Sequence, residues 1–148
     1  MVEDLVSIKE IGNSDYVLLN KFLQNAGESL SSFRYFNTRP TSVIENHLVS
    51  AVLMCNSTVV GYGHLDRGSG VIWLGIAVSE MEIGKGFGKL MMSFLVTRAN
   101  EMNFPVISLT VDKNNIKAIR LYNRFGFLYV RDINEKVQLM ERSRNLQG

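Results

Sequence analysis

The chain is poor in cysteine, in net charge and in long apolar runs, and each shortage excludes a class of protein. The single Cys55 excludes an internal disulfide and leaves no thiolate cluster, so we expect no metal site. A net charge of +2 over 148 residues is too small to indicate a nucleic-acid partner, although it suits an anionic small ligand. No apolar stretch approaches the roughly 18 residues of a membrane span, so no membrane association is expected.

Targeting and domain signals are also sparse. Residues 1–4 lack the basic and apolar regions of a signal peptide, and we therefore expect a cytoplasmic protein. The length suits one domain with a substantial core. Because no linker, repeat or low-complexity segment divides the sequence, residues 1–148 are predicted to form a single domain.

The most informative segment present is GKGFGK at residues 84–89, directly after the apolar run 71–78. Three glycines before a helix-compatible segment predict bare backbone N–H groups at a helix N-terminus. Together with the positive end of the helix dipole, such groups form an anion site. Glycine also lets a pyrophosphate approach the chain without a Cβ in the way.

Periodicity and turn residues predict an α/β protein. Strands are expected over residues 5–11, 49–55, 58–66, 71–78, 106–111, 127–131 and 136–141. Helices are expected from residue 14 or 15, from 41 or 42 to 47, from the glycine loop to about 103, and from Asn114 or Asn115 to Gly126. The order β-α-α-β-β-β-α-β-α-β-β implies a mixed sheet with helices on both faces.

Two common phosphate-binding loops do not fit the glycine segment. A nucleoside-triphosphate loop needs four residues between its first Gly and Gly-Lys, and then Ser or Thr. Here three residues separate Gly84 from Gly88, and Leu90 follows Lys89. The dinucleotide fingerprint fails because Lys89 stands at its third glycine and the loop lies in mid-chain.

The segment from Val78 to Leu90 resembles motif A of the GCN5-related N-acetyltransferases, whose Gln/Arg-x-x-Gly-x-Gly/Ala pattern cradles the pyrophosphate of acetyl-coenzyme A. The segment 115–127, with Asn115, Ala118, Leu121-Tyr122 and Gly126-Phe127, is similar to motif B. With the element order, the resemblance covers roughly residues 5–141. One departure is Ile83, which stands at the Gln/Arg position.

The resemblance implies a cofactor site for acetyl-CoA. It assigns the pyrophosphate to the backbone amides of three glycines, with two lysines adding positive charge: Gly84, Gly86, Gly88, Lys85 and Lys89. It assigns the pantetheine arm and acetyl carbonyl to main-chain groups of Ile76 and Val78, and a further contact to Asn115. Plain alternatives exist, since the lysines suit a solvated helix start and Asn115 suits a helix cap.

By the same resemblance, Tyr122 would protonate the departing coenzyme thiolate. A phenol with a pKa of about 10 can act as such a general acid. The alternative is a tyrosine whose ring packs in the core.

An ammonium acceptor must also lose a proton, but Ile72 and Leu74, the positions where many relatives carry a base, are apolar. If residues 67–70 form the hairpin turn, Asp66 pairs with Val71 and His64 with Trp73. Strand alternation then gives one face with Tyr62, His64, Asp66 and Trp73. His64 is the predicted base, because only its unperturbed pKa lies near neutrality; the alternative is a structural histidine beside Asp66. His47 is expected to be structural.

The acceptor is predicted to meet an aromatic and cationic wall. Arg34, Tyr35 and Arg39, with Asp66 and Trp73, could hold a sugar face and an anionic group. A faint similarity to acetyltransferases of amino sugars agrees with this. The alternative places Phe33 and Phe36 in the core and the arginines in surface ion pairs.

The sequence therefore predicts an acetyl-CoA-dependent N-acetyltransferase that acts by direct transfer on a small-molecule amine. Two alternatives stay open: a coenzyme-A-binding sensor or assembly module without activity, and an O-acetyltransferase on the same fold. An exposed edge in the closing hairpin could support a homodimer.

Overall fold

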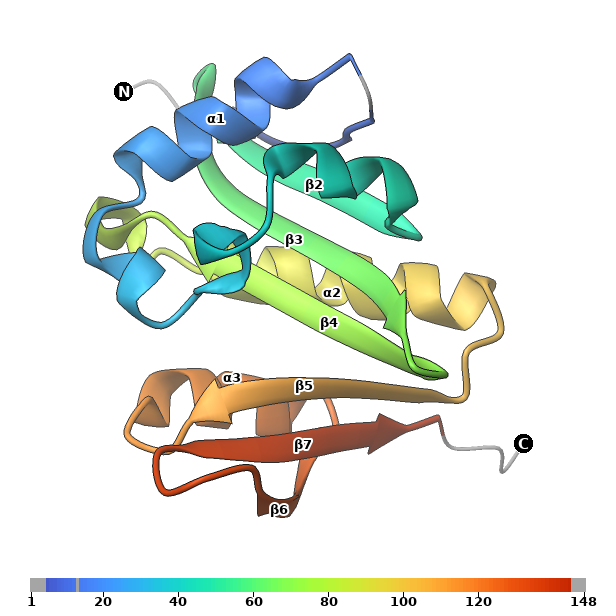
Figure 1. Cartoon of the computed structure of the whole chain (residues 1–148). Coiled ribbons are helices and arrows are strands. Elements are labelled where there is room, and N and C mark those ends of the chain that lie inside the picture. Colours follow the sequence, from blue (N-terminus) through green and yellow to red (C-terminus); the bar gives the residue numbers. More distant parts are fainter. Residues whose placement is uncertain (1–4, 13, 145–148) are drawn as a thin grey trace.

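The computed structural model describes residues 5–12 and 14–144. Residues 1–4, from which the absence of a signal peptide was predicted, lie outside the described residues. The chain forms one mixed sheet of seven strands in the order β1-β2-β3-β4-β5-β7-β6 (Figure 1). The strands are β1 (Val6–Glu10), β2 (Val49–Cys55), β3 (Thr58–Gly68), β4 (Val71–Val78), β5 (Val106–Asp112), β6 (Leu128–Asp132) and β7 (Val137–Ser143). The α-helices are α1 (Tyr16–Asn25), α2 (Phe87–Glu101) and α3 (Ile116–Arg124). Short 3-10 turns are η1 (Gly27–Ser31), η2 (Tyr35–Asn37), η3 (Thr41–Asn46) and η4 (Glu80–Glu82).

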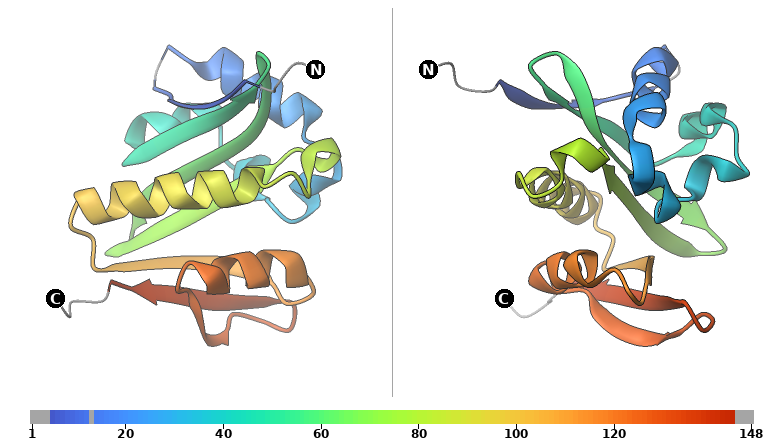
Figure 2. Two further views of the ribbon diagram at one scale, coloured as in Figure 1. Left: turned by 180° about the vertical axis from the view of Figure 1, so that it is seen from behind. Right: turned by 90° about the vertical axis from the view of Figure 1, so that its left-hand side faces the viewer.

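The sheet separates two hydrophobic cores. Helices α2 and α3 cover one face, and α1 with the turns that follow it covers the other (Figures 1 and 2). Met91 and Leu95 of α2 pack with Leu65 on the first face, whereas Phe22 of α1 packs with Tyr62 on the second. The alternation of Tyr62 and Leu65 to opposite sides follows from the pleat of β3.

Helix α2 lies unusually close to β3 because Gly63 has no side chain. A Cβ at Gly63 would lie 2.7 Å from Met91 Cγ and 2.9 Å from Leu95 Cδ1. At the start of the helix, a Cβ at Gly88 would lie 3.9 Å from Val78 Cγ2, which places the first turn of α2 beside the end of β4. In the described part of the chain, no helix is both long and apolar enough to cross a membrane.

Most predicted elements are confirmed, and the predicted bounds of β2 and β4 match the structure. The second predicted helix is wrong in type: Thr41–Asn46 forms a 3-10 turn, and Glu45 within it accepts a hydrogen bond from the Tyr16 hydroxyl. Leu90, an apolar residue in the first turn of α2, is 45% exposed.

The predicted β3–β4 register is wrong by two residues. Asp66 pairs with Trp73, and His64 pairs with Gly75. The turn has two residues rather than four, because Ser69 (φ 53°) and Gly70 (φ 78°) both take the positive φ that a tight hairpin turn requires. A shift of two residues preserves the side on which each residue lies, so the predicted face with Tyr62, His64, Asp66 and Trp73 is retained.

Candidate active site

Strands β4 and β5 meet at a single point and then separate. Among the described residues their only ladder pair is Trp73 with Ser108, near the start of both strands. Toward their carboxyl ends the two strands diverge (Figure 1). The β5-facing edge of β4 therefore has no strand partner beyond this pair.

The main-chain groups at this edge belong to alternate residues of β4. Ser79 donates its N–H to the carbonyl of Val60 on β3, at 2.8 Å. Because hydrogen-bonded residues alternate along an antiparallel pair, the main-chain groups of Ile76 and Val78 point away from β3, toward the opening. These are the two residues predicted to hold an extended ligand as an added strand would.

The glycine loop ends β4 and begins α2. Gly84 (φ 91°) and Gly86 (φ 85°) adopt left-handed conformations, and a Cβ at either would meet nothing within 4 Å. Gly86 is the N-cap of α2 and supplies no side-chain cap, so the first N–H groups of the helix lack that partner. Gly88 lies inside the first turn, where Leu121 of α3 packs against it: a Cβ there would lie 3.2 Å from Leu121 Cδ2.

The charged side chains of the loop are at the surface. Lys85 Nζ lies 2.7 Å from Glu82 Oε2 in an exposed ion pair. Lys89 is exposed on the first turn of α2, and Ile83, at the irregular position, is half exposed. The inner surface of this loop is therefore formed by its backbone rather than by its side chains.

Helix α3 positions Asn115 and Tyr122. Asn115 caps the helix, and its Oδ1 accepts the N–H of Ala118 at 3.3 Å. Tyr122 is 8% exposed, and its ring meets Phe127 at a centroid distance of 6.2 Å. Burial raises the pKa of Tyr122 above its ordinary value. The phenol therefore keeps its proton at neutral pH.

His64 lies on the other face of the sheet. It is 2% exposed, and its Nδ1 lies 2.9 Å from the Tyr62 hydroxyl. Its other edge lies over Gly75, where a Cβ would sit 2.5 Å from Nε2. Burial, and then the nearby His47, hold the pKa of His64 well below its ordinary value. The imidazole is neutral at pH 7.

His47, which was expected to be structural, lies against His64. The ring centroids of the two histidines are 4.5 Å apart, and the Nε2 of His47 lies 2.7 Å from the Tyr35 hydroxyl. Tyr35 in turn donates to Asp66 Oδ2 at 2.9 Å. Sequence spacing could not show this, because His47 follows an irregular turn rather than a strand with readable alternation. The one available signal was that the chain contains two histidines.

The predicted acceptor residues divide between two places. Tyr35, Asp66 and Arg39 lie together, with the Arg39 guanidinium 4.2 Å from the centroid of the Tyr35 ring. Trp73, half-buried beside Gly68, pairs with Asp66 across β3 and β4 and belongs to this first group. Arg34 lies apart from them.

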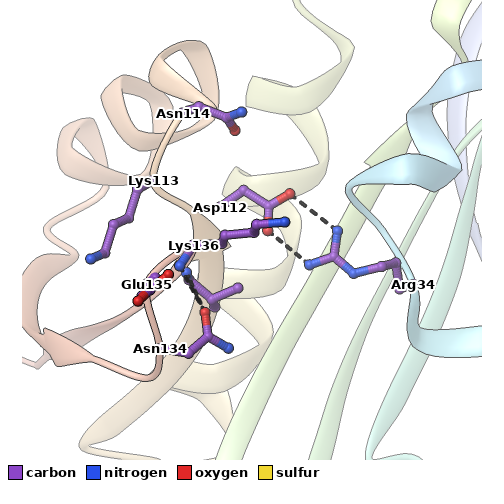
Figure 3. A pocket seen from close by; sticks show the side chains of 8 residues that line it. Arg34, Asp112, Lys113, Asn114, Asn134, Glu135 and Lys136 are labelled. Atoms are coloured by element: carbon purple, nitrogen blue, oxygen red, sulfur yellow. Dashed lines mark hydrogen bonds and ion pairs between the residues drawn. The ribbon is translucent and has the colours of Figure 1, made fainter.

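Arg34 reaches across to the end of β5. Its guanidinium binds the Asp112 carboxylate through two hydrogen bonds of 2.8 and 3.1 Å (Figure 3). The pair forms one wall of a cavity of about 630 Å³. The other lining residues come from the end of β5 and from the β6–β7 turn: Lys113, Asn114, Asn134, Glu135, Lys136 and Val137.

Replacing Arg34 by glutamine tests its predicted role in acceptor binding. An ion pair at the surface contributes about 1 kcal/mol or less, so the melting temperature should change little. If Arg34 contacts the acceptor, the KM for the acceptor should rise at least about fivefold, with little change in the affinity for acetyl-CoA. Steady-state kinetics would check this, and an unchanged KM would remove Arg34 from the site. Arg98→Gln, which breaks the surface pair with Glu10, is the matched control.

Comparison of this chain with known proteins identifies its family. The model of the acetyltransferase (GNAT) family matches residues 16–127. The chain belongs to this family. GNAT acetyltransferases use acetyl-CoA, so the predicted family, fold and acetyl donor are confirmed.

Two curated GNAT relatives come from Bacillus subtilis. The spermine/spermidine N(1)-acetyltransferase of strain 168 is 38% identical over 81 residues, which are 51% of this chain and 53% of that protein. The probable spermine N(1)-acetyltransferase of subspecies natto is 37% identical over 81 residues, with the same coverage. The chain thus matches about half the length of these relatives.

Solved GNAT structures share the fold over nearly the whole chain. The ribosomal-protein-S18-alanine N-acetyltransferase of Escherichia coli superposes with a TM-score of 0.76 at 19% identity, covering 97% of both chains. The PaiA N-acetyltransferase of Thermoplasma acidophilum, solved with coenzyme A, gives 0.75 at 14% identity, covering 94% of this chain and 99% of that one. At these identities the likeness shows the fold alone.

Proposed function

We propose that the chain is an acetyl-CoA-dependent N-acetyltransferase that transfers the acetyl group directly to a primary amine of a small molecule. The observation that carries this proposal is the unpaired edge of β4, which ends in the glycine loop at the start of α2. An extended ligand with a terminal pyrophosphate has main-chain partners along that edge and amide donors at its end.

The residues present fit the acetyl donor. Main-chain groups of Ile76 and Val78 suit the pantetheine arm, and the open positions at Gly84 and Gly86 leave room for phosphate oxygens. Lys89 adds a positive charge near the helix start, and Asn115 stands at the start of α3. With Ile83 in place of Gln or Arg, the backbone carries phosphate binding.

Two groups on opposite faces of the sheet suit the two proton transfers. Tyr122 lies on the α2 and α3 side and retains its proton, which supports our assignment of it as the general acid for the leaving thiolate. His64 lies on the α1 side and is neutral, so its imidazole has a lone pair for an acceptor proton. Acetyl-CoA, when bound, supplies the acetyl group as a reactive thioester.

The acceptor class is proposed as a polyamine or a similar aliphatic amine. The support is the similarity to the spermine/spermidine N(1)-acetyltransferase of Bacillus subtilis, whose name gives polyamines as its acceptors. The aromatic and cationic wall that suggested an amino sugar is engaged internally: Arg34 binds Asp112, and Arg39 lies on Tyr35. A homodimer through β6, an edge strand with every residue exposed, stays a prediction.

Acetyl-CoA binding to a loop variant tests the cofactor site. Gly86→Ala places a methyl group where the amides face outward, so we expect the dissociation constant for acetyl-CoA to rise at least tenfold by calorimetry. Gly70→Ala is the matched control, because Gly70 also has a positive φ and open space but lies in the β3–β4 turn. Both variants should lose about 1 kcal/mol of stability.

Equal binding by the two variants would contradict the proposed pyrophosphate site. Thiol release from acetyl-CoA, measured with spermidine and a panel of other amines, then tests the reaction. Tight binding without thiol release for any amine would favour the sensor alternative.

A further inference from the structure

The α1 face of the sheet holds a continuous series of polar side chains that the proposed reaction does not yet use in full. Its members are linked by hydrogen bonds and come from β2, β3 and the segment 35–47. We call this series the relay: His64, Tyr62, Ser50, His47, Tyr35 and Asp66.

The inner end of the relay is His64. Its Nε2 lies over Gly75 of β4, one residue before Ile76, whose main-chain groups face the β4–β5 opening. Because Gly75 has no side chain, nothing from that residue stands between Nε2 and the edge where the acetyl group is proposed to lie. The Nδ1 on the opposite side of the ring lies 2.9 Å from the Tyr62 hydroxyl.

The middle of the relay is Ser50 and His47. The Ser50 hydroxyl lies 2.7 Å from His47 Nδ1 and is also hydrogen-bonded to Tyr62. The Tyr62 hydroxyl and His47 Nδ1 are 3.5 Å apart, and Ser50 is hydrogen-bonded to both residues. Ser50 and His64 are almost fully buried, which keeps water out of this stretch.

The outer end of the relay is Asp66. His47 Nε2 lies 2.7 Å from the Tyr35 hydroxyl, which is 2.9 Å from Asp66 Oδ2. The Asp66 side chain is 26% exposed, so it can exchange protons with solvent. Arg39 lies at the same end of the relay, with its guanidinium carbon 4.2 Å from the centroid of the Tyr35 ring.

We propose that the relay carries the acceptor's proton from His64 to Asp66. This step rests on the proposed acetyltransferase function. The ammonium N–H bond breaks and an N–H bond forms at His64 Nε2, leaving the amine its lone pair for attack. The Nδ1 proton of His64 passes to Tyr62, the Tyr62 proton to Ser50, and the Ser50 proton to His47 Nδ1. The Nε2 proton of His47 passes to Tyr35, and the Tyr35 proton to Asp66, which releases it to solvent.

The relay fixes the proton positions of both histidines before reaction. Each member must donate toward Asp66, because a carboxylate accepts and cannot donate. His64 must therefore carry its proton on Nδ1, and His47 must carry its proton on Nε2. These tautomers are necessary for the relay, and the kinetics below separate a relay from a cluster that is only structural.

Nitrogen-15 NMR of the imidazoles tests this arrangement without any acceptor. The chain has two histidines, so the long-range spectrum contains two ring systems that a His47→Gln variant assigns. At pH 7.5 we expect neutral His64 as the Nδ1–H tautomer and neutral His47 as the Nε2–H tautomer. His64 as the Nε2–H tautomer, or as a cation, would overturn the relay. The acetyl-CoA titrations above test the proposed function separately.

Kinetics of Tyr35→Phe test whether the relay moves protons. The variant keeps the ring that packs against His64 at 4.4 Å and removes the hydroxyl that joins His47 to Asp66. With spermidine as acceptor, we expect kcat to fall at least about tenfold. With a fluorinated amine that is already neutral at the assay pH, we expect a fall of less than twofold.

Tyr16→Phe is the matched control, because its hydroxyl binds Glu45 outside the relay. Equal losses for Tyr35→Phe with both acceptors would indicate a structural role and contradict the proposal. If no amine is acetylated, the proposed function fails and the relay, which rests on it, fails with it.

Discussion

Tyr122→Phe is expected to lower kcat by about a hundredfold or more while leaving the affinity for acetyl-CoA within about twofold. General acids contribute roughly 10²–10⁴ to rate. The phenol is buried with its pKa raised, so it holds a proton that the leaving thiolate needs. Its removal takes away that proton and little packing, because the ring and its contact with Phe127 remain. Steady-state kinetics and calorimetry on the same protein give both quantities.

Tyr129→Phe is the control for this experiment. Tyr129 lies exposed on β6 and donates to Asp132, away from the β4–β5 opening. The substitution should leave kcat and the melting temperature nearly unchanged. A Tyr122→Phe variant with the same kcat as the Tyr129→Phe variant would remove Tyr122 from its role as acid.

Gly75→Ala is expected to abolish most activity and to destabilise the fold by about 1–3 kcal/mol, the range for overpacking a filled core. A Cβ at this position would lie 2.5 Å from His64 Nε2 and 2.7 Å from its Cε1. The ring packs against both Tyr35 and His47, at centroid distances of 4.4 and 4.5 Å, so displacing it would disturb those contacts. Thermal unfolding and thiol-release kinetics measure the two losses.

A double-mutant cycle tests whether the destabilisation by Gly75→Ala comes from its contact with His64. In the His64→Ala background the space is free, so Gly75→Ala should cost less than about 0.5 kcal/mol in stability. Gly68→Ala in the same hairpin is a second control, since its Cβ would sit 3.6 Å from the Trp73 ring, an ordinary contact. An equal cost of Gly75→Ala in both backgrounds would show that the two residues do not interact.

Local signals allowed much of the fold to be predicted. β2 and β4 are apolar runs between turn signals, and half of the residues of β4 are β-branched, which favours a strand. Asn115 caps α3 as its position indicates, because a short polar side chain at that place satisfies a free N–H group. The glycine loop could be located because glycine alone tolerates its positive φ values without strain.

What could not be predicted depends on tertiary contacts. The β3–β4 register depends on Ser69 adopting a φ of 53° in the turn. A positive φ is uncommon for serine, so the sequence does not predict it. Residues 35–46 form 3-10 turns whose aromatic rings pack on the sheet, so no periodic pattern placed His47 beside His64. Arg34 binds Asp112, which lies 78 positions further along the sequence. Opposite charge alone cannot identify which acidic residue an arginine will meet.

The single ladder pair between Trp73 and Ser108 has a consequence for release of the product. The sheet consists of a four-stranded block and a three-stranded block, and a bound pantetheine arm would act as an eighth strand lying between them. If acetyl-CoA binds along β4 as proposed, coenzyme A would keep that arm after the acetyl group has left and would fill the gap in the sheet as the substrate does. We therefore expect release of coenzyme A, rather than acetyl transfer, to limit the rate of the cycle.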